Sequence, residues 1–276
     1  VNMLRGITVS CNIFFYKVGG GYEQEVPGDG LGIDRIGIYA RALGYGSALG
    51  IDLPGELAGL IPSPDWKRIN LGESWSTGDT YNAATGQGFV LATPLQVLTS
   101  VATLGNGGRV MWPHIVTDIL DGEGNVVQHF EPRVLWDISD GVLTPGTPDA
   151  LVEPRVIRLV QEGMRGVVAN EEGTAYKYAR IGVADPDLDL ELIPSAGKTG
   201  TGEFCDARAL AQDRCIPGRW PTHAWYAAYA PYENPEIAVV AFVYNGGEGA
   251  VTSGPIVRQV LETYFALKAI DAARSP

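Results

Sequence analysis

The sequence predicts an α+β fold in which an antiparallel sheet is flanked by helices. Four segments combine a helical capping signal with apolar residues at helical spacing, and two pairs of apolar, strand-like segments flank short turns. With 45% hydrophobic residues among 276, the chain is able to bury a substantial core. This length suits one large domain or two small ones, and neither a domain boundary nor an internal repeat is evident.

Each of the four expected helices begins at a capping residue or a proline, both of which favour a helix N-terminus. In chain order these starts are Asp34, Thr93 with Pro94, Pro154, and Pro255. Gly44 is expected to end the first helix, and the cluster Gly105 to Gly108 to end the second. All four helices are expected to pack one apolar face onto the core.

The expected strands form hairpins. Residues 114–121 and 124–130 flank one turn, and residues 222–231 and 236–245 flank another. The segment 236–245 is apolar enough to lie in the middle of a sheet, and the last helix follows it directly. The segment 195–204, "SAGKTGTGEF", is expected to be the strand that precedes 222–231. The turn-rich stretches 139–149 and 185–194 are expected to be connections, the second an acidic, solvated loop.

Composition excludes several functional classes. A net charge of −12 spread along the chain argues against a nucleic-acid surface, and no apolar run is long enough to span a bilayer. The three cysteines and three histidines have no metal-ligand spacing, so neither a metal nor another cofactor is indicated. Cys205 and Cys215 either form a disulfide or remain two thiols in a loop. The chain starts mid-pattern at Val1, without a signal peptide, and is therefore expected to be a piece of a longer protein.

The first candidate site is the strip "TVSCNIFFY", in which Ser10 and Asn12 precede an apolar run. The ordinary interpretation is that one of them caps a helix by accepting a backbone N–H. If both side chains point the same way, they instead offer a proton relay and an amide donor at the mouth of a cleft. Cys11, between them, is expected to point away from such a site.

The second candidate is Lys198-Thr199-Gly200-Thr201. On a strand, Lys198 and Gly200 face one way and the two threonines the other. At a sheet edge, the backbone N–H groups and the hydroxyls are able to hold an extended peptide or a carboxylate beside the ammonium group. The alternative is a glycine-rich turn with an exposed lysine.

A Ser-x-x-Lys pattern also occurs, at Ser195 and Lys198. A serine nucleophile needs a lysine base beside it, which this spacing provides on a helix. Here Pro194 precedes the pair and a glycine lies within it, so the segment is not expected to be helical. We therefore expect that Ser195 is not a nucleophile.

Taken together, an early Ser-x-Asn, a late Lys-Thr-Gly-Thr strand and a terminal helix resemble the second and third motifs of the penicillin-recognising serine enzymes. The chain resembles the transpeptidase domain of class B penicillin-binding proteins, most closely the elongation-type penicillin-binding protein 2 group. Matching blocks cover nearly the whole chain, in the family's order, and include "GIDLPGELAGLIPSPDWKR", "GQGFVLATPLQVLTSVATLGNGG" and "HAWYAAYAP". The resemblance implies the fold shared by penicillin-binding proteins and serine β-lactamases.

The family's first motif, a helical Ser-x-x-Lys that carries the acylated serine, is expected several dozen residues before Ser-x-Asn. Only nine residues precede Ser10. The chain, residues 1–276, is therefore expected to be the C-terminal portion of a transpeptidase domain, lacking the nucleophile and inactive alone. A non-catalytic scaffold or β-lactam sensor is the alternative, although Ser-x-Asn, unlike the Ser-x-Val of sensor domains, argues against a sensor.

The resemblance also implies a role for each site residue. Ser10 would pass a proton to the leaving amine, and Asn12 would hold the substrate amide. Lys198 would supply positive potential that keeps the base lysine neutral. Thr199, Gly200 and Thr201 would bind the substrate, the threonines through its terminal carboxylate. His223 and Trp225 are expected to be structural, and Gln87 to order a loop near the cleft.

The same resemblance implies peptidoglycan stem peptides as substrates and β-lactams as inhibitors. The intact protein would work with a membrane glycosyltransferase of the elongation machinery and bind no nucleic acid. It would lie on the extracytoplasmic face of the bacterial cytoplasmic membrane, anchored by an N-terminal segment absent here.

Overall fold

The computed structural model describes residues 1–26, 28, 30–139, 151–182 and 193–274. Its centre is an antiparallel sheet in the strand order β5 (Ala196–Glu203), β6 (Thr222–Ala230) and β7 (Ile237–Val243). The segment "SAGKTGTGEF" is thus the strand that pairs with β6, as predicted. The turn-rich stretches predicted at 139–149 and 185–194 fall almost entirely outside the described residues.

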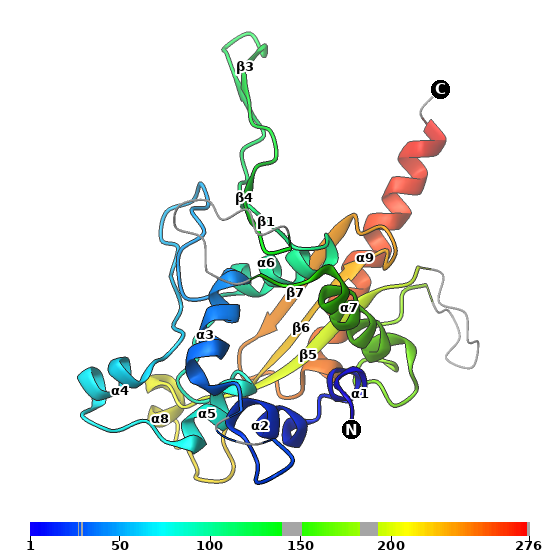
Figure 1. Cartoon of the computed structure of the whole chain (residues 1–276). Helices are drawn as coiled ribbons and strands as arrows, with labels where there is room; N and C mark the ends of the chain where they lie inside the picture. The colour runs from blue at the N-terminus through cyan, green and yellow to red at the C-terminus, as the bar shows by residue number, and fades with distance from the viewer. Residues whose placement is uncertain (27, 29, 140–150, 183–192, 275–276) are drawn as a thin grey trace.

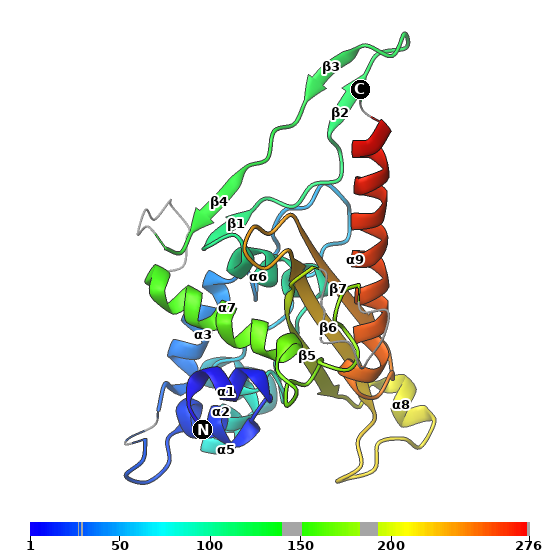
Figure 2. The same cartoon turned by 90° about the vertical axis from the view of Figure 1, so that its right-hand side faces the viewer.

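Helices cover both faces of this sheet (Figures 1 and 2). Helix α9 (Gly249–Arg274) packs on one face, and α6 (Pro94–Gly105) and α7 (Pro154–Ala169) pack on the other. The most deeply buried side chains of this core come from β6, α7 and α9: Tyr226, Tyr229, Val167, Val168, Val257 and Leu261. The predicted α+β arrangement of an antiparallel sheet flanked by helices is confirmed.

The remaining elements surround this core or project from it. The helices are α1 (Met3–Thr8), α2 (Asn12–Gly20), α3 (Gly32–Ala42), α4 (Pro64–Leu71), α5 (Thr77–Ala84) and α8 (Ala207–Ala211). The strands, in the pairs β1–β4 and β2–β3, are β1 (Arg109–Met111), β2 (Asp118–Leu120), β3 (Val126–His129) and β4 (Val134–Asp137).

The predicted hairpin at residues 114–130 is present as β2 and β3, and it extends away from the body of the molecule (Figures 1 and 2). The Asp121 carboxylate accepts hydrogen bonds from the backbone N–H groups of Glu123 and Asn125, which fixes the turn. All of the residues in β2 and β3 are exposed. This ribbon is therefore held by its own turn and ladder, without burial in the core.

Local sequence signals account for several helix starts. The Thr93 hydroxyl accepts from the Gln96 N–H and the Gln96 Oε1 accepts from the Thr93 N–H, which forms a capping box on α6 with Pro94 as the first helical residue. Ser76 and Asp79 form the same box on α5. The predicted start of α7 at Pro154 is also confirmed. Gln96 is fully buried and also donates to two carbonyl groups, so it ties α6 to the preceding segment.

Two of the predicted helix starts are wrong. Helix α3 begins at Gly32, so Asp34 lies in its first turn. There its carboxylate interacts favourably with the helix dipole, but it does not cap the helix. Helix α9 begins at Gly249, and Pro255 lies inside it. A proline is common at the first helical position, but Pro255 lies inside α9 beyond its first turn, where it donates no backbone hydrogen bond, and the sequence does not distinguish the two positions.

The predicted place of the segment 236–245 in the sheet is also wrong. Strand β7 pairs only with β6 among the described strands, so β6 is central and β7 lies at an edge. Most β7 residues are half-buried. In β6, by contrast, Ala224 and every residue from Tyr226 to Ala230 are buried. An apolar run indicates burial of a strand's faces, and it carries no information about whether both edges are paired.

Candidate active site

Ser10 and Lys198, which are far apart in the sequence, meet at the edge of the sheet. The Lys198 Nζ donates a hydrogen bond of 2.8 Å to the Ser10 Oγ across a separation of 188 residues. Lys198 belongs to β5, and Ser10 lies in the turn between α1 and α2. The structure thus brings Ser10 of the Ser-x-Asn strip to Lys198 of the Lys-Thr-Gly strand.

The backbone of Ser10 explains how its hydroxyl reaches β5. Its φ of +52° is left-handed, which is uncommon for a residue with a side chain and is found mainly where the surroundings enforce it. The Ser10 N–H donates to the Ile7 carbonyl and the Cys11 N–H to the Gly6 carbonyl, so the turn closes the end of α1. The chain then restarts as α2 in a new direction.

The capping interpretation of Ser10 and Asn12 is wrong. The residue that precedes α2 is Cys11, and it makes no side-chain capping bond. Asn12 is the first residue of α2 and is exposed. The Ser10 hydroxyl accepts from Lys198 instead of from a helix N–H.

Lys198 has an environment unlike that of the other cations. Burial disfavours its charged form and lowers its pKa to about 8. Its ammonium donates to the Ser10 hydroxyl and to the Thr199 carbonyl, which are both neutral acceptors. Lys17, by contrast, hydrogen-bonds to the Glu25 carboxylate, which raises the pKa of that lysine.

We expect Lys198 to titrate near pH 8 in the folded chain, because burial costs the ammonium more than the amine. The shift of its ¹³Cε resonance with pH, followed by NMR in lysine-labelled protein, measures this directly. Lys17 and Lys268 serve as internal controls, since their carboxylate partners hold both pKa values above the ordinary lysine range. A Lys198 midpoint above pH 10 would contradict the buried environment.

The rest of the Lys-Thr-Gly-Thr segment alternates as predicted for a strand. Lys198 and Gly200 lie opposite Ala227 and Trp225 of β6, and a β-carbon at Gly200 would lie 3.2 Å from the Trp225 β-carbon. Thr199 and Thr201 therefore point to the other face. Thr201 is exposed, and its Oγ1 lies 3.5 Å from the Gly249 N–H, which donates to it.

Thr174 is a part of this region that sequence reasoning missed. Its Oγ1 lies 2.7 Å from the Thr199 Oγ1, with either hydroxyl as the donor. Its backbone N–H donates to the Thr8 carbonyl at the end of α1. Thr174 thus links α1 to β5. A single threonine after a helix carries no local signal of such a link, since the link depends on how α1, α7 and β5 pack.

Gln87 reaches the free edge of β5. Its Nε2 donates to the Thr201 carbonyl at 2.8 Å, and its Oε1 accepts from the Glu203 N–H at 3.1 Å. Sequence reasoning expected Gln87 to order a loop near the cleft. Its amide also pairs with the backbone of β5, the strand that carries Lys-Thr-Gly-Thr.

The family model for the penicillin-binding protein transpeptidase domain matches residues 1–262. The chain belongs to this transpeptidase family. It is 32% identical over 266 residues to the peptidoglycan D,D-transpeptidase MrdA of Escherichia coli K12, covering 95% of this chain and 37% of that protein. The corresponding protein of Salmonella typhimurium LT2 is 32% identical over 272 residues, with 96% and 38% covered. The chain thus spans well under half the length of these curated relatives.

Solved structures agree with this family assignment. The structure of Pseudomonas aeruginosa PBP2 in complex with WCK 5153 matches with a TM-score of 0.71 and 30% identity, covering 96% of this chain and 49% of that one. The complex of PBP2 and MreC from Helicobacter pylori matches with a TM-score of 0.68 and 27% identity, covering 96% and 40%. The predicted resemblance to the penicillin-binding protein 2 group is confirmed.

In this transpeptidase-family chain, β5 leads into a loop that is closed covalently. Cys205 and Cys215 form a disulfide, which decides between the two alternatives that the sequence left open. Next to it, the Phe204 ring stacks on His223 with centroids 3.7 Å apart. Burial lowers the pKa of His223, and the nearby Asp206 carboxylate opposes that shift. Trp225 packs against Phe242, so His223 and Trp225 both make structural contacts, as predicted.

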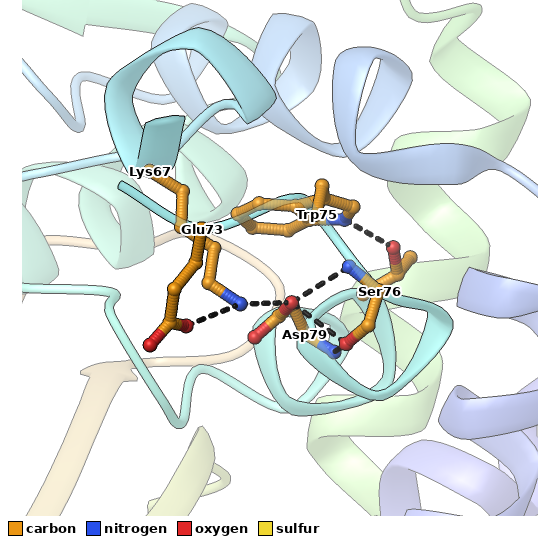
Figure 3. Close-up of polar contacts among 6 residues, drawn as sticks. Lys67, Glu73, Trp75, Ser76 and Asp79 are labelled. Atoms are coloured by element: carbon orange, nitrogen blue, oxygen red, sulfur yellow. Dashed lines mark hydrogen bonds and ion pairs between the residues drawn. The ribbon is translucent and has the colours of Figure 1, made fainter. Parts of the chain in front are cut away.

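A buried ion pair joins α4 to α5 (Figure 3). The Lys67 Nζ donates to the Asp79 carboxylate at 2.8 Å and lies 3.3 Å from the Glu73 carboxylate. The side chains of Lys67 and Asp79 are only 8% and 13% exposed, whereas that of Glu73 is 65% exposed. The pair raises the pKa of Lys67 and lowers that of Asp79, although burial opposes both shifts.

Two negative findings apply to the described part of the transpeptidase-family chain. No helix there is both long and apolar enough to cross a membrane. Within the same residues, no cluster of three or more His, Cys, Asp or Glu side chains has the arrangement of a metal site.

Proposed function

We propose that this chain supplies the Ser-x-Asn and Lys-Thr-Gly part of a peptidoglycan D,D-transpeptidase, the enzyme class that cross-links the bacterial cell wall. The observation that carries the proposal is the 2.8 Å contact between the Lys198 ammonium and the Ser10 hydroxyl. Two motifs 188 residues apart converge there, as the chemistry of the family requires. The names of the MrdA relatives support the same activity.

In the proposed reaction, a serine on a Ser-x-x-Lys segment attacks the carbonyl carbon of the D-Ala-D-Ala bond. The terminal D-alanine leaves as an amine and needs a proton. Ser10 is suited to pass that proton, because its hydroxyl accepts from Lys198 and retains its own hydrogen to donate. An amine of a second stem peptide then attacks the acyl-enzyme and completes the cross-link.

Lys198 has an electrostatic role in this proposal. With a pKa of about 8, it is mostly protonated at neutral pH, and its positive charge keeps the neighbouring base lysine neutral. Its charge also attracts the carboxylate of the substrate. Asn12, exposed at the start of α2, would hold the substrate amide.

The edge of β5 would bind the end of the peptide. Thr201 is exposed and offers its hydroxyl to the terminal carboxylate. Thr199 is able to donate its hydrogen to that carboxylate while it accepts one from Thr174. Gly200 keeps this stretch of strand free of a side chain, and the Thr201 N–H would be one of two donors that stabilise the oxyanion.

The proposal extends to the setting of the whole protein. Residues 1–276 would form the C-terminal portion of the transpeptidase domain. The complete protein would act at the extracytoplasmic face of the cytoplasmic membrane, bind β-lactams and work with a membrane glycosyltransferase. Solved relatives, one a complex of PBP2 with MreC and one described as part of a peptidoglycan synthase complex, support protein partners of this kind.

The coding sequence upstream of Val1 provides the first test. We expect it to continue in frame into a helical Ser-x-x-Lys segment, and we call the product of the complete frame the serine-containing form. Fluorescent penicillin should label the serine-containing form covalently and leave the 276-residue chain unlabelled, because the chain offers no activated serine. A frame without such a segment, or a penicilloyl adduct on Ser10 or Ser195, would favour the scaffold or sensor alternative.

A further inference from the structure

The outward edge of β5 is partly occupied by side chains of the protein itself. Along an antiparallel strand, the N–H and C=O of every second residue face away from the paired neighbour. Here the outward residues are Thr199, Thr201 and Glu203, because Gln87 reaches the Thr201 carbonyl and the Glu203 N–H. The Thr199 carbonyl accepts from the Lys198 ammonium. The Thr201 N–H thus lies between two positions that the protein itself occupies.

The Gln87 amide pairs with β5 much as a neighbouring strand would. It donates to one carbonyl and accepts from the N–H two residues further along, which is the spacing of one ladder unit. Both contacts are made by one planar group, so the peptide segment from Thr201 to Glu203 is held at two points. An extended ligand is therefore able to pair along β5 only as far as Thr201.

The loop around Gln87 is shaped to present this side chain. Gly86 and Gly88 have φ values of +74° and +68°, which residues with side chains rarely adopt. The Gln87 N–H donates to the Asn82 carbonyl at 2.9 Å, so the loop folds back on the end of α5. A β-carbon at Gly88 would lie 3.1 Å from the Asn82 β-carbon. The reversal at Gln87 therefore depends on a glycine at either side.

Helix α4 packs against the residues that follow the Gln87 loop. The Trp66 ring packs on Phe89, two residues after Gln87, with centroids 5.3 Å apart. The Lys67 ammonium lies 5.6 Å from the same ring and forms the buried ion pair with Asp79 of α5 (Figure 3). Both the start of α5, through Asp79, and Phe89 after the loop thus contact helix α4. This arrangement limits how far Gln87 is able to move away from β5.

We propose that Gln87 is a positioning residue that holds the outward edge of β5, and with it the Thr201 N–H and hydroxyl that would bind the substrate. It also ends the part of the edge that a peptide is able to occupy. The consequence for the reaction rests on the proposed function, whereas the hold on β5 does not. Gln87 acts through Thr201 and touches no reacting atom.

The first experiment measures the hold itself, in the 276-residue chain. Gln87→Ala is expected to raise the exchange rate of the Glu203 amide about tenfold, because an outward N–H loses its only side-chain acceptor. Amides of the central strand, such as Tyr226, should keep their protection. Gln128→Ala, which removes an exposed glutamine from β3, is the matched control and should change neither. An unchanged Glu203 rate in folded Gln87→Ala would overturn the proposal.

Gln87→Glu separates the two contacts and serves if the alanine variant does not fold. A carboxylate retains the acceptor for the Glu203 N–H and loses the donor to the Thr201 carbonyl. The Glu203 amide should then stay protected to within about threefold of the parent, while the ¹³C′ resonance of Thr201 shifts. If the Glu203 amide lost its protection from exchange while the Thr201 ¹³C′ resonance stayed in place, the assigned geometry would be contradicted.

The second experiment tests the consequence for acylation in the serine-containing form. Gln87→Ala is expected to lower the penicillin acylation rate constant about 10- to 10²-fold and to change the preceding binding constant much less, as a misplaced donor does. A role confined to stability would leave the acylation rate constant of the folded fraction unchanged, and that result would overturn the positioning role. If the parent form is not labelled at all, the proposed function fails, while the Glu203 and Thr201 measurements still decide the contact of Gln87.

Discussion

Replacing Lys198 with methionine is expected to lower the penicillin acylation rate of the serine-containing form by about 10²- to 10³-fold. Methionine has similar length and fills the same half-buried space, so the strand should remain paired to β6. The change removes the donor to the Ser10 hydroxyl and the positive charge that, in the proposed reaction, keeps the base lysine neutral. Stopped-flow acylation kinetics measure the effect.

The pH profile adds a second readout for Lys198. With a pKa of about 8, the parent lysine loses its charge as the pH rises above 8, so acylation that depends on this charge should decline there. The variant should lack that decline. Lys177→Met, at an exposed lysine, is the matched control and should leave both rate and profile unchanged. An acylation rate within threefold of the parent would rule out the electrostatic role.

Gly249→Ala is expected to lower the free energy of unfolding by about 3 kcal/mol, at the upper end of the cost of overpacking. A β-carbon at Gly249 would lie 2.1 Å from the Trp225 carbonyl oxygen and 2.3 Å from the Gly200 carbonyl oxygen. Both are backbone atoms of adjacent strands, so no side-chain rotation relieves the contact. Urea denaturation followed by tryptophan fluorescence measures the loss.

The control for this prediction is Gly122→Ala in the β2–β3 turn. A β-carbon there would meet no atom within 4 Å, and the backbone does not require glycine, so a change below about 0.5 kcal/mol is expected. The Gly249 variant should also disturb Thr201, since the Gly249 N–H donates to its hydroxyl. Equal stability of the two variants would contradict the close packing of α9 on β5 and β6.

Features decided by local sequence were predictable. The start of α6 follows from Thr93, Pro94 and Gln96, whose capping bonds involve residues within one helical turn. The pairing of β5 with β6 follows from two strand-like segments in succession. The position of Lys198 on a strand, with the threonines on the opposite face, follows from the alternation of side chains.

Features decided by packing between distant segments were not predictable in detail. The left-handed backbone of Ser10 depends on how α1 ends and α2 begins, and a serine gives no local reason to adopt it. The contact between Thr174 and Thr199 joins a loop after α7 to β5. The pairing of Gln87 with the backbone of β5 spans 114 residues to Thr201. Each required the tertiary structure to bring the partners together.

The β2–β3 hairpin has a practical consequence for work on this protein. Its strands contribute no side chain to the buried core, and its turn lies at the tip of a ribbon that extends from the body (Figure 2). Tips of this kind accept inserted residues with little effect on the rest of a chain. A fluorophore or an immobilisation tag placed in this turn would report on or tether the molecule while leaving Ser10, Lys198 and Gln87 undisturbed.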